Sequence, residues 1–409
     1  MARTAPVCAA ISPPAAVACI TTALLILASG CGCVAARAAA PGGAVPTSSL
    51  PPECDRYSDL LGPLAVRLEA WRAAGGVNAS EGKRLRQEIE GGGEGAFVSI
   101  RNGQVHVLVK REGFQSKTYG ALMLLHRLVS RFGRKHLPDM EFGIHRGDVP
   151  KPGAWMCFCG RRGELPGTWL YPDFGYYAWP EIMMPPWEAI RQRTQEVVER
   201  WPFAARSNKM FWRGGAGKHI NTDVRGKLLR ALENRTDIAD VQAIPPFDVL
   251  LQRGLQGFTP LWDFCKHKYI LYTEGNSYSG RLKYHVLCGS VIISHPRKYD
   301  TMLSALMREG RHIVTTVDNE WSDVAQIHSR LETNPQLAES IGRSTALLAN
   351  QLTEDGVSCY LLALLRAYAQ AMTYTPPPPP ADSSYLESFV LGRMKGVAGG
   401  YKTLALAAE

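Results

Sequence analysis

The chain has 409 residues, of which 45% are hydrophobic and 20% are charged. This composition is typical of a folded globular protein and excludes a disordered chain, a collagen-like chain and a polytopic transporter. The 46 basic and 37 acidic side chains give a net charge of +9, which suits a phosphate-bearing or other anionic ligand. The basic residues do not form the dense blocks typical of nucleic-acid-binding proteins, so no nucleic-acid partner is expected.

The first 40 residues differ from the rest of the chain. Arg3 precedes an apolar stretch over 15–28, and the next charged residue is Arg37. This pattern predicts either a cleaved signal peptide or an uncleaved type II membrane anchor within 1–40, followed by a stem over 41–53. In both cases the folded part enters the secretory pathway, in the lumen of the Golgi or the endoplasmic reticulum.

Beyond this leader, helical and strand patterns alternate. Apolar spacing predicts helices over 59–73 and 118–132. Between them, strands over 97–100 and 105–109 flank Asn102-Gly103, a strong hairpin signal. A strand over 140–144 then precedes a loop rich in proline, glycine and aromatic residues that reaches 186. The elements expected after this loop are helix 187–200, strand 210–212, helix 223–233, strand 269–273, a helix from 278, strand 291–294, helix 301–307, strand 312–316, helix 336–351 and helix 356–372.

Strands that alternate with helices indicate an α/β fold built on parallel sheets, and the length of the chain favours two such sheets. Five consecutive prolines at 376–380 are expected to end the compact part. The sequence therefore predicts a Pro-rich flexible tail over 375–409.

Polar side chains gather in three loops that follow predicted strands, where open α/β sheets bind ligands. In the first, Gly214-Gly215-Ala216-Gly217 would let backbone N–H groups approach a phosphate, with Arg213 or Arg225 adding charge-assisted hydrogen bonds. The alternative is an ordinary strand-to-helix turn, since the loop lacks the Gly-Lys-Ser/Thr ending of a P-loop.

The second loop, 273–281, reads Thr-Glu-Gly-Asn-Ser-Tyr-Ser-Gly-Arg. Glycine and small hydroxyl groups at a helix start, with Arg281 one turn in, form a good cradle for a diphosphate. The alternative is a simple helix cap by Ser277 or Ser279. In the third loop, Asp148 follows a short strand and could act as a general base, although a loop aspartate beside a proline also forms turns.

Sequons and cysteines agree with an oxidising lumen. Asn78 and Asn234 each begin an acceptor sequence for N-glycosylation. An even six cysteines follow the leader, and no metal site is expected because Cys157 and Cys159 have no second pair at zinc-binding spacing. These six are Cys54, Cys157, Cys159, Cys265, Cys288 and Cys359.

The order of several strings resembles the capsule-associated-protein type of glycosyltransferase, family ninety, which includes Rumi-type protein O-glucosyltransferases and fungal xylosyltransferases. The strings are Leu137-Pro138-Asp139-Met140-Glu141-Phe142 with Asp148-x-Pro150, Asp173-Phe174-Gly175 with Trp179-Pro180-Glu181, Phe211-Trp212-Arg213-Gly214, Lys266-His267-Lys268-Tyr269, the 274–281 loop, Cys288-Gly289-Ser290-Val291 and Ser358-Cys359-Tyr360. The resemblance covers 54–374. It implies a GT-B-like fold of two Rossmann-type domains with the active site in the cleft between them. It also implies a UDP-sugar donor, inversion at the sugar and no metal ion.

The resemblance assigns roles by position. Asp148 falls on the catalytic base, an acceptor-side subdomain occupies about 54–200, a nucleotide-sugar subdomain occupies about 201–353, and the last helices return to 374. The implied disulfides are Cys54–Cys359 and Cys265–Cys288, whereas Cys157 and Cys159 have no counterpart. The loops and the resemblance together give a donor site of Phe174, Gly175, Trp179, Arg213, Gly215, Arg225, Ser277, Ser279 and Arg281.

Two departures from the family pattern affect these assignments. Gly215 stands where Rumi-type enzymes commonly carry serine, and the longer loop makes the alignment of Arg225 less secure than that of Arg281. The usual Lys-Asp-Glu-Leu ending is absent, which favours a Golgi-type anchored enzyme or one that is retained differently. Two functions are expected as alternatives: an enzyme that moves glucose or xylose from a UDP-sugar to a protein serine or polysaccharide hydroxyl, or a catalytically silent lumenal protein that binds sugar or nucleotide.

Overall fold

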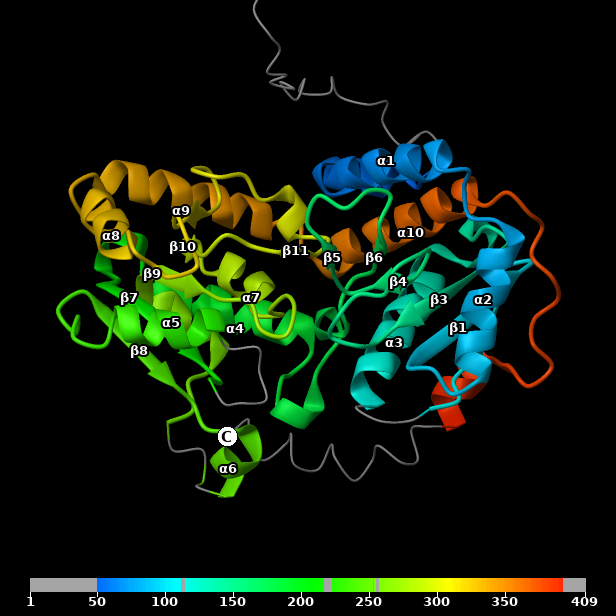
Figure 1. The fold of residues 1–409 in the computed structure, drawn as a ribbon, viewed down its shortest axis with the longest axis horizontal. Coiled ribbons are helices and arrows are strands. Elements are labelled where there is room, and N and C mark those ends of the chain that lie inside the picture. The colour runs from blue at the N-terminus through cyan, green and yellow to red at the C-terminus, as the bar shows by residue number, and fades with distance from the viewer. Residues whose placement is uncertain (1–49, 112–114, 217–222, 253, 255–256, 393–409) are drawn as a thin grey trace, which may run out of the picture. The chain divides into compact units, whose positions relative to one another are not determined.

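The computed structural model describes residues 50–111, 115–216, 223–252, 254 and 257–392, which form helices around two larger sheets (Figure 1). The expected leader over 1–40 lies outside the described residues, as does most of the expected stem. No helix in the described ranges is both long and apolar enough to cross a membrane.

Helices and strands alternate along most of the chain. The helices are α1 (Ser58–Ala73), α2 (Ala79–Glu90), α3 (Gln115–Phe132), α4 (Trp187–Arg200), α5 (Asp223–Ala231), α6 (Phe247–Gln252), α7 (Leu282–Leu287), α8 (Val324–Glu332), α9 (Pro335–Ala349) and α10 (Glu354–Ala371). The strands are β1 (Gly95–Arg101), β2 (Gln104–Leu108), β3 (Met140–His145), β4 (Met156–Cys157), β5 (Gly160–Arg161), β6 (Trp169–Leu170), β7 (Ser207–Gly214), β8 (Ala239–Ala243), β9 (His267–Tyr272), β10 (Val291–Ser294), β11 (Tyr299–Asp300), β12 (Val314–Thr315) and β13 (Ser384–Tyr385).

The first sheet has the strand order β13-β2-β1-β3-β4-β6 and is mixed. Its pairs β13–β2, β2–β1 and β1–β3 are antiparallel, whereas β3–β4 and β4–β6 are parallel. The predicted hairpin is confirmed: Asn102 and Gly103 have φ angles of 47° and 71° and connect paired Arg101 and Gln104. Because this tight turn reverses the chain, the prediction of two parallel sheets is wrong for the first sheet.

The second sheet has the order β12-β10-β9-β7-β8, and all its pairs are parallel, as predicted. Buried side chains of α5, α8 and α9 pack on one set of its residues, including Trp212 and Ile293. Phe211 and Ile270, which point to the other face, contact Phe264 and side chains of α4. Since helices cover both faces, the central residues of β7, β9 and β10 are apolar and buried, whereas polar residues such as Asn208 and Lys209 stand at the strand ends.

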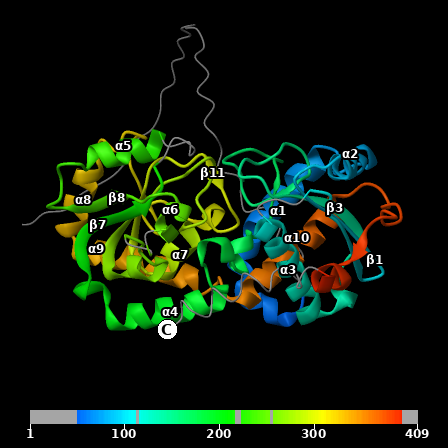
Figure 2. The same cartoon turned by 90° about the horizontal axis from the view of Figure 1, so that it is seen from below.

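Two disulfides join distant parts of the sequence, as the resemblance implied. Cys54–Cys359 closes 305 residues of chain and links the segment before α1 to α10. These two helices lie side by side in both views (Figures 1 and 2). Cys265–Cys288 links the segment before β9 to the residue that follows α7. Cys157 and Cys159 are buried free thiols.

Several local predictions need correction. The helix expected from 278 begins at Leu282, because the preceding residues form a loop. The helix expected over 301–307 is only a 3₁₀ turn, Ser304–Leu306, since the Ser304 hydroxyl accepts a hydrogen bond from the Thr301 N–H and competes with helical pairing. Helices α2 and α8 and strand β8 were not anticipated.

The segment after the prolines is also not the flexible tail that the sequence predicted, as far as residue 392. Ser384–Tyr385 forms strand β13 against β2, Leu386 is fully buried, and Glu387 pairs with Arg134. Phe389 contacts the ring of Tyr119 on α3. The reason is tertiary, because an exposed sheet edge offers unpaired backbone groups to any extended segment that reaches it.

We therefore expect Leu386→Ala to lower the free energy of unfolding by about 2–5 kcal/mol, the usual cost of a cavity in a core. Urea unfolding followed by fluorescence measures this. Leu391→Ala is the control, because Leu391 is 67% exposed and its truncation should change stability by less than about 0.5 kcal/mol. Equal, small effects of both substitutions would show that the segment after the prolines does not pack on the fold.

Candidate functional site

A cavity of about 480 Å³ lies where loops that follow strands of both sheets meet. Loops after β3 and β6 contribute from the first sheet, and loops after β7 and β9 from the second. The sequence-predicted residues that line it are Asp148, Phe174, Trp179, Arg213, Gly215, Arg225, Ser277, Ser279 and Arg281.

Asp148 lines this cavity with its side chain half exposed. The Lys117 ammonium donates to Oδ1 at 2.7 Å, and the Asn276 amide donates to Oδ2 at 3.3 Å. Burial raises the pKa of Asp148, but the hydrogen bond and charge of Lys117 outweigh burial and hold the pKa below its ordinary value. The carboxylate is therefore ionised at neutral pH and can accept a proton from a hydroxyl group.

The main chain of Asp148 is held from two sides. The Ser277 hydroxyl donates a short hydrogen bond to its carbonyl oxygen, and the Cys159 thiol donates to the same oxygen at 3.5 Å. Burial raises the pKa of Cys159 to about 12, so this cysteine is a thiol and serves here as a donor. The loop that carries Asp148 is thus fastened to the 273–281 loop.

Arg225 and Arg281 place two positive charges in the wall of the same cavity. Arg225 donates to the carbonyl oxygens of Glu274 and Gly215 at 3.0 and 2.8 Å. Arg281 donates to the carbonyl oxygen of Arg213 and, through Nε, to Ser279 Oγ at 3.3 Å. Burial lowers the pKa of Arg281 to about 9 and that of Arg225 to about 10, and the charge of Arg225 also lowers the pKa of Arg281.

Neither Arg225 nor Arg281 forms an ion pair with a carboxylate among the residues that the structure describes. Guanidinium groups removed from water normally have anionic partners. An anion that enters the cavity would supply the missing negative charge. This pair of arginines therefore forms the part of the cavity best suited to a diphosphate.

Arg213 has a different role from the one predicted. Its guanidinium donates to both carboxylate oxygens of Asp240 at 2.8 and 2.9 Å and lies over the ring of Phe211. Arg213 lines the cavity, but its charge is already neutralised by Asp240 on β8. The pairing of Arg213 with Asp240 was not predicted from the sequence, because strand β8, which carries Asp240, was not anticipated.

Gly214 leaves the space that Arg281 needs. A Cβ atom on Gly214 would lie 2.8 and 2.9 Å from the two terminal nitrogens of Arg281 and 2.6 Å from the Trp212 ring. All three distances are too short for non-bonded atoms, so a side chain at this position would displace the guanidinium. The glycine at the end of β7 thus allows close packing of a charged group.

Glu274 fixes the start of the 273–281 loop. Its buried carboxylate accepts hydrogen bonds from the backbone N–H groups of Lys298 and Tyr299. Its own N–H donates to Nε2 of His295, so the ring carries its proton on Nδ1, which lies 3.0 Å from the Asn319 side-chain oxygen. Burial lowers the pKa of His295 to about 4, which agrees with a neutral ring.

The aromatic loop over 173–179 forms another wall. Phe174 and Trp179 line the cavity with their rings at 4.8 Å in an edge-to-face arrangement. Gly175 was predicted to contact the donor, but it does not line the cavity. It packs against Lys283 instead, and a Cβ atom at this position would lie 2.8 Å from Lys283 Nζ.

A buried ion pair joins this loop to α7. Lys283 Nζ lies 2.9 Å from Asp173 Oδ1 and donates to the Gly280 carbonyl at 2.8 Å, and the side chains of Lys283 and Asp173 are only 4% and 7% exposed. Asp173 also accepts from the Gly175 N–H at 2.8 Å. Burial lowers the pKa of Lys283, an effect that the charge of Asp173 opposes.

Apolar side chains complete the cavity. They come from the residues that follow β8, from α6, and from the segment before β9 that contains a 3₁₀ turn. A surface of this kind suits a flat or weakly polar part of a ligand, next to the arginines that suit its charge. These residues are Ile244, Pro245, Pro246, Leu250, Phe258, Leu261 and Phe264.

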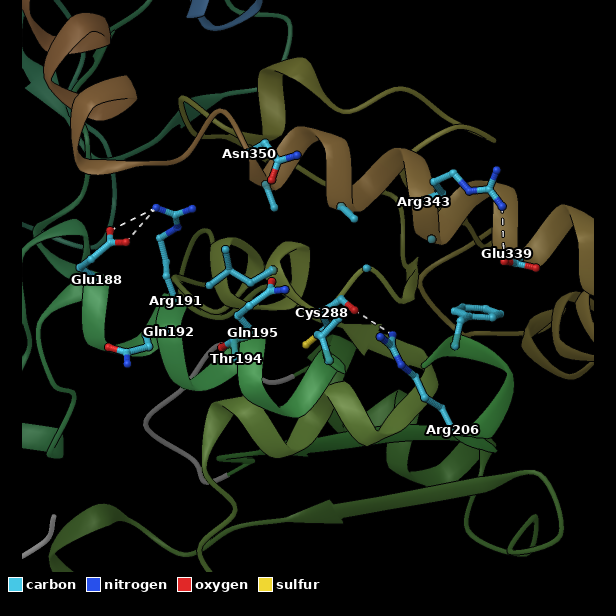
Figure 3. Close-up of a pocket in the computed structure, with 17 residues that line it drawn as sticks. Glu188, Arg191, Gln192, Thr194, Gln195, Arg206, Cys288, Glu339, Arg343 and Asn350 are labelled. Carbon is cyan, nitrogen blue, oxygen red and sulfur yellow. Dashed lines mark hydrogen bonds and ion pairs between the residues drawn. The ribbon is translucent and has the colours of Figure 1, made fainter. Parts of the chain in front are cut away.

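A second cavity of about 510 Å³ lies between α4 and α9 (Figure 3). Its arginines already have partners: Arg191 pairs with Glu188, Arg343 pairs with Glu339, and Arg206 donates to the carbonyl oxygen of Cys288 at 2.7 Å (Figure 3). Apart from disulfide-bonded Cys288, no sequence-predicted site residue lines it. We therefore place the candidate site in the cavity that contains Asp148 and Arg281.

Four polar side chains of the site were not anticipated: Lys117, Asp173, Asn276 and Lys283. Asn276 stands inside a loop that the sequence did single out, and Lys283 lies two residues after Arg281. No sequence signal distinguishes Lys117 from a solvated lysine at a helix start. Its role arises because α3 packs beside the loop that follows β3.

Asn78 and Asn234, the predicted glycosylation positions, are both exposed. The Asn78 side-chain oxygen also caps α2 by accepting from the Glu81 N–H at 3.0 Å. Modification at these two positions stays a prediction. Within the described ranges, no group of three or more His, Cys, Asp and Glu side chains could hold a metal ion.

Comparison with known proteins identifies the family of this chain. The model of Glycosyl transferase family 90 matches residues 53–398, which is most of the chain. The matched range contains all residues that line the cavity and both disulfides.

Curated relatives are named "Protein O-glucosyltransferase 1". The rat protein is 24% identical over 258 residues, which cover 59% of this chain and 64% of the rat protein. The human protein is 24% identical over 267 residues, which cover 61% of this chain and 66% of the human protein. The similarity thus spans slightly less than two thirds of the length of these relatives.

Proposed function

This chain belongs to glycosyl transferase family 90, and on that premise we propose that it moves glucose or xylose from a UDP-sugar to a hydroxyl group. One observation carries the proposal. An ionised carboxylate, Asp148, lines a cavity that is also lined by Arg225 and Arg281, which have no carboxylate partners among the described residues. A negatively charged leaving group and a proton acceptor are both required for this transfer.

The donor would place its diphosphate against Arg225 and Arg281. Their N–H groups would neutralise the charge that grows on the leaving oxygen, which is the role a metal ion has in other transferases. The N–H groups of the 275–281 loop add further donors. The aromatic and apolar walls would hold the nucleoside and the sugar.

The reaction follows from these positions. The acceptor hydroxyl oxygen attacks the anomeric carbon, and the bond from that carbon to the diphosphate oxygen breaks. The electron pair of the broken bond leaves with UDP, and the proton of the acceptor hydroxyl passes to Asp148. Because acceptor and leaving group lie on opposite sides of the sugar, the product has the inverted configuration.

The relatives' printed name supports a protein acceptor and glucose as the donor sugar, whereas a polysaccharide hydroxyl and xylose are the alternatives. We further propose that the two sheets form a GT-B-like pair of Rossmann-type domains with the cavity between them. The donor side then corresponds to the all-parallel second sheet, since Arg213 stands near the end of β7 and Gly215 and Arg281 follow strands β7 and β9.

The proposed location is the lumen of the secretory pathway. Two disulfides form within the described residues, and such bonds persist in oxidising compartments. The exposed sequons at Asn78 and Asn234 agree with this location. A protein acceptor in the same compartment would be a glycoprotein.

Arg281→Ala should weaken UDP binding by about 1.5–3 kcal/mol, the value of a hydrogen bond to a charged group. Calorimetry with UDP measures this change. Arg330→Ala, which removes an exposed arginine on α8, is the matched control and should leave UDP affinity unchanged. If Arg281→Ala bound UDP as tightly as wild type while retaining its fold, the diphosphate would lie elsewhere.

Activity should persist in EDTA, because arginines rather than a metal ion stabilise the leaving diphosphate. The measurement is UDP release from UDP-glucose and UDP-xylose by dialysed enzyme, with and without chelator. Complete loss of turnover in EDTA that manganese restores would contradict this mechanism.

Asp148→Asn is the experiment that tests the function most directly. The amide keeps the shape of the side chain but cannot take the acceptor's proton, so transfer should fall by roughly 10²–10⁴-fold. UDP affinity should stay close to wild type. Asp139→Asn is the control, since Asp139 accepts from the Asn102 N–H on the same segment of chain and asparagine can replace it as an acceptor. Near-normal turnover of Asp148→Asn would exclude Asp148 as the base.

A further inference from the structure

The two oxygens of the Asp148 carboxylate have unequal partners. Oδ1 accepts a charge-assisted hydrogen bond from Lys117 at 2.7 Å, and Oδ2 accepts a neutral one from Asn276 at 3.3 Å. Charge-assisted bonds are shorter and stronger than neutral ones, and 3.3 Å is beyond the usual N–H···O range. The bond to Asn276 is therefore the one that a ligand can replace at least cost.

Lys117 is well placed to hold Oδ1. Its side chain is 14% exposed and comes from the first turn of α3, and Nζ also lies 5.7 Å from the centre of the Phe174 ring. The Phe174 ring belongs to the aromatic wall of the cavity. The lysine thus occupies the junction between the proposed base and the wall that faces the sugar.

The other titratable groups around this carboxylate are neutral near pH 7. On β3, burial lowers the pKa of His145. After β4, the pKa of Cys159 is about 12, and in the 273–281 loop burial raises the pKa of Tyr278. Among the described groups that lower the pKa of Asp148, Lys117 has the largest effect, through its hydrogen bond and its charge, ahead of the hydrogen bond from Asn276 and the charge of protonated His145.

We propose that Lys117 is a positioning residue for the transfer, which holds Asp148 ionised and oriented through Oδ1 and leaves Oδ2 for the acceptor hydroxyl in place of Asn276. This inference rests on the proposed function. During the reaction the acceptor proton moves to Oδ2 while the Lys117 ammonium keeps all its protons. The lysine acts through Asp148 and does not itself exchange a proton.

The pH dependence of kcat/KM tests the role of Lys117. The active form of Asp148 is ionised, so activity falls as the pH drops through the pKa of Asp148. Removing the charge of Lys117 raises that pKa, and the acid limb of the Lys117→Met profile should move to higher pH. We expect about a tenfold additional loss at pH 5 relative to pH 8, with the KM for UDP-glucose within about twofold of wild type.

Two comparisons make this result specific. Lys117→Arg keeps the charge and should restore the acid limb of the wild-type profile. Lys110→Met removes a lysine that pairs with Asp382 outside the cavity, and its profile should match wild type. Thermal melting checks folding, and Lys117→Gln replaces Lys117→Met if the latter unfolds.

The outcomes separate this inference from the proposed function. If Asp148→Asn is inactive and the Lys117→Met profile superimposes on wild type, Lys117 has no such role while the function stands. A loss of Lys117→Met activity that is equal at every pH would likewise overturn the inference and leave a structural role. If Asp148→Asn itself retains turnover, the proposed role of Asp148 is contradicted, and with it the proposed function on which the inference about Lys117 rests.

Discussion

The buried ion pair between Asp173 and Lys283 determines how the parts of the site face one another. Asp173 stands at the start of the aromatic loop that follows β6, and Lys283 stands on α7, which follows β9. Because both side chains are almost completely buried, leaving either charge unpaired would cost several kcal/mol of folding free energy. The pair therefore holds the aromatic wall, contributed by the first sheet, against the helix start that carries Arg281 in the second.

Ion pairing also distinguishes charged side chains that are neutralised within the fold from those that keep their charge in the cavity wall. Arg213 and Lys283 pair with the carboxylates of Asp240 and Asp173, whereas Arg206 bonds only carbonyl and hydroxyl oxygens among the described residues. Arg225 and Arg281 likewise bond neutral groups, but unlike Arg206 they line the cavity that contains Asp148. An arginine of that cavity therefore keeps its charge for a ligand when no carboxylate such as Asp240 lies within its reach.

The charge distribution in the cavity follows from this arrangement. Arg225 and Arg281 come from the side of the second sheet, and Asp148 comes from the side of the first, as do the aromatic rings of Phe174 and Trp179. Ser277 and Asn276 belong to the arginine-bearing loop yet contact Asp148. In the proposed function, the 273–281 loop would therefore link donor binding to the orientation of the base.

Many of the helices and strands, and the loops that carry the candidate site, could be predicted from the sequence. Apolar periodicity located α1, α3, α4, α9 and α10 within a few residues, because each buries a continuous face and its pattern is local. The Asn102-Gly103 turn and strands β7, β9, β10 and β12 of the second sheet were also predicted from local patterns, whereas β8 was not. The three loops with Asp148, Arg225 and Arg281 were found because glycine, hydroxyl and charged residues directly after strands are chemically distinctive.

Other features depend on contacts between residues far apart in sequence, and local patterns do not encode them. The antiparallel part of the first sheet, the docking of β13 on β2 and the neutralisation of Arg213 by Asp240 arise only when distant segments meet. The pairing of Lys117 with Asp148 is of the same kind. The sequence by itself determined which residues could carry charge into the site, and the tertiary structure decided which of those charges are neutralised and which remain for a ligand, because neutralisation depends on distance in space.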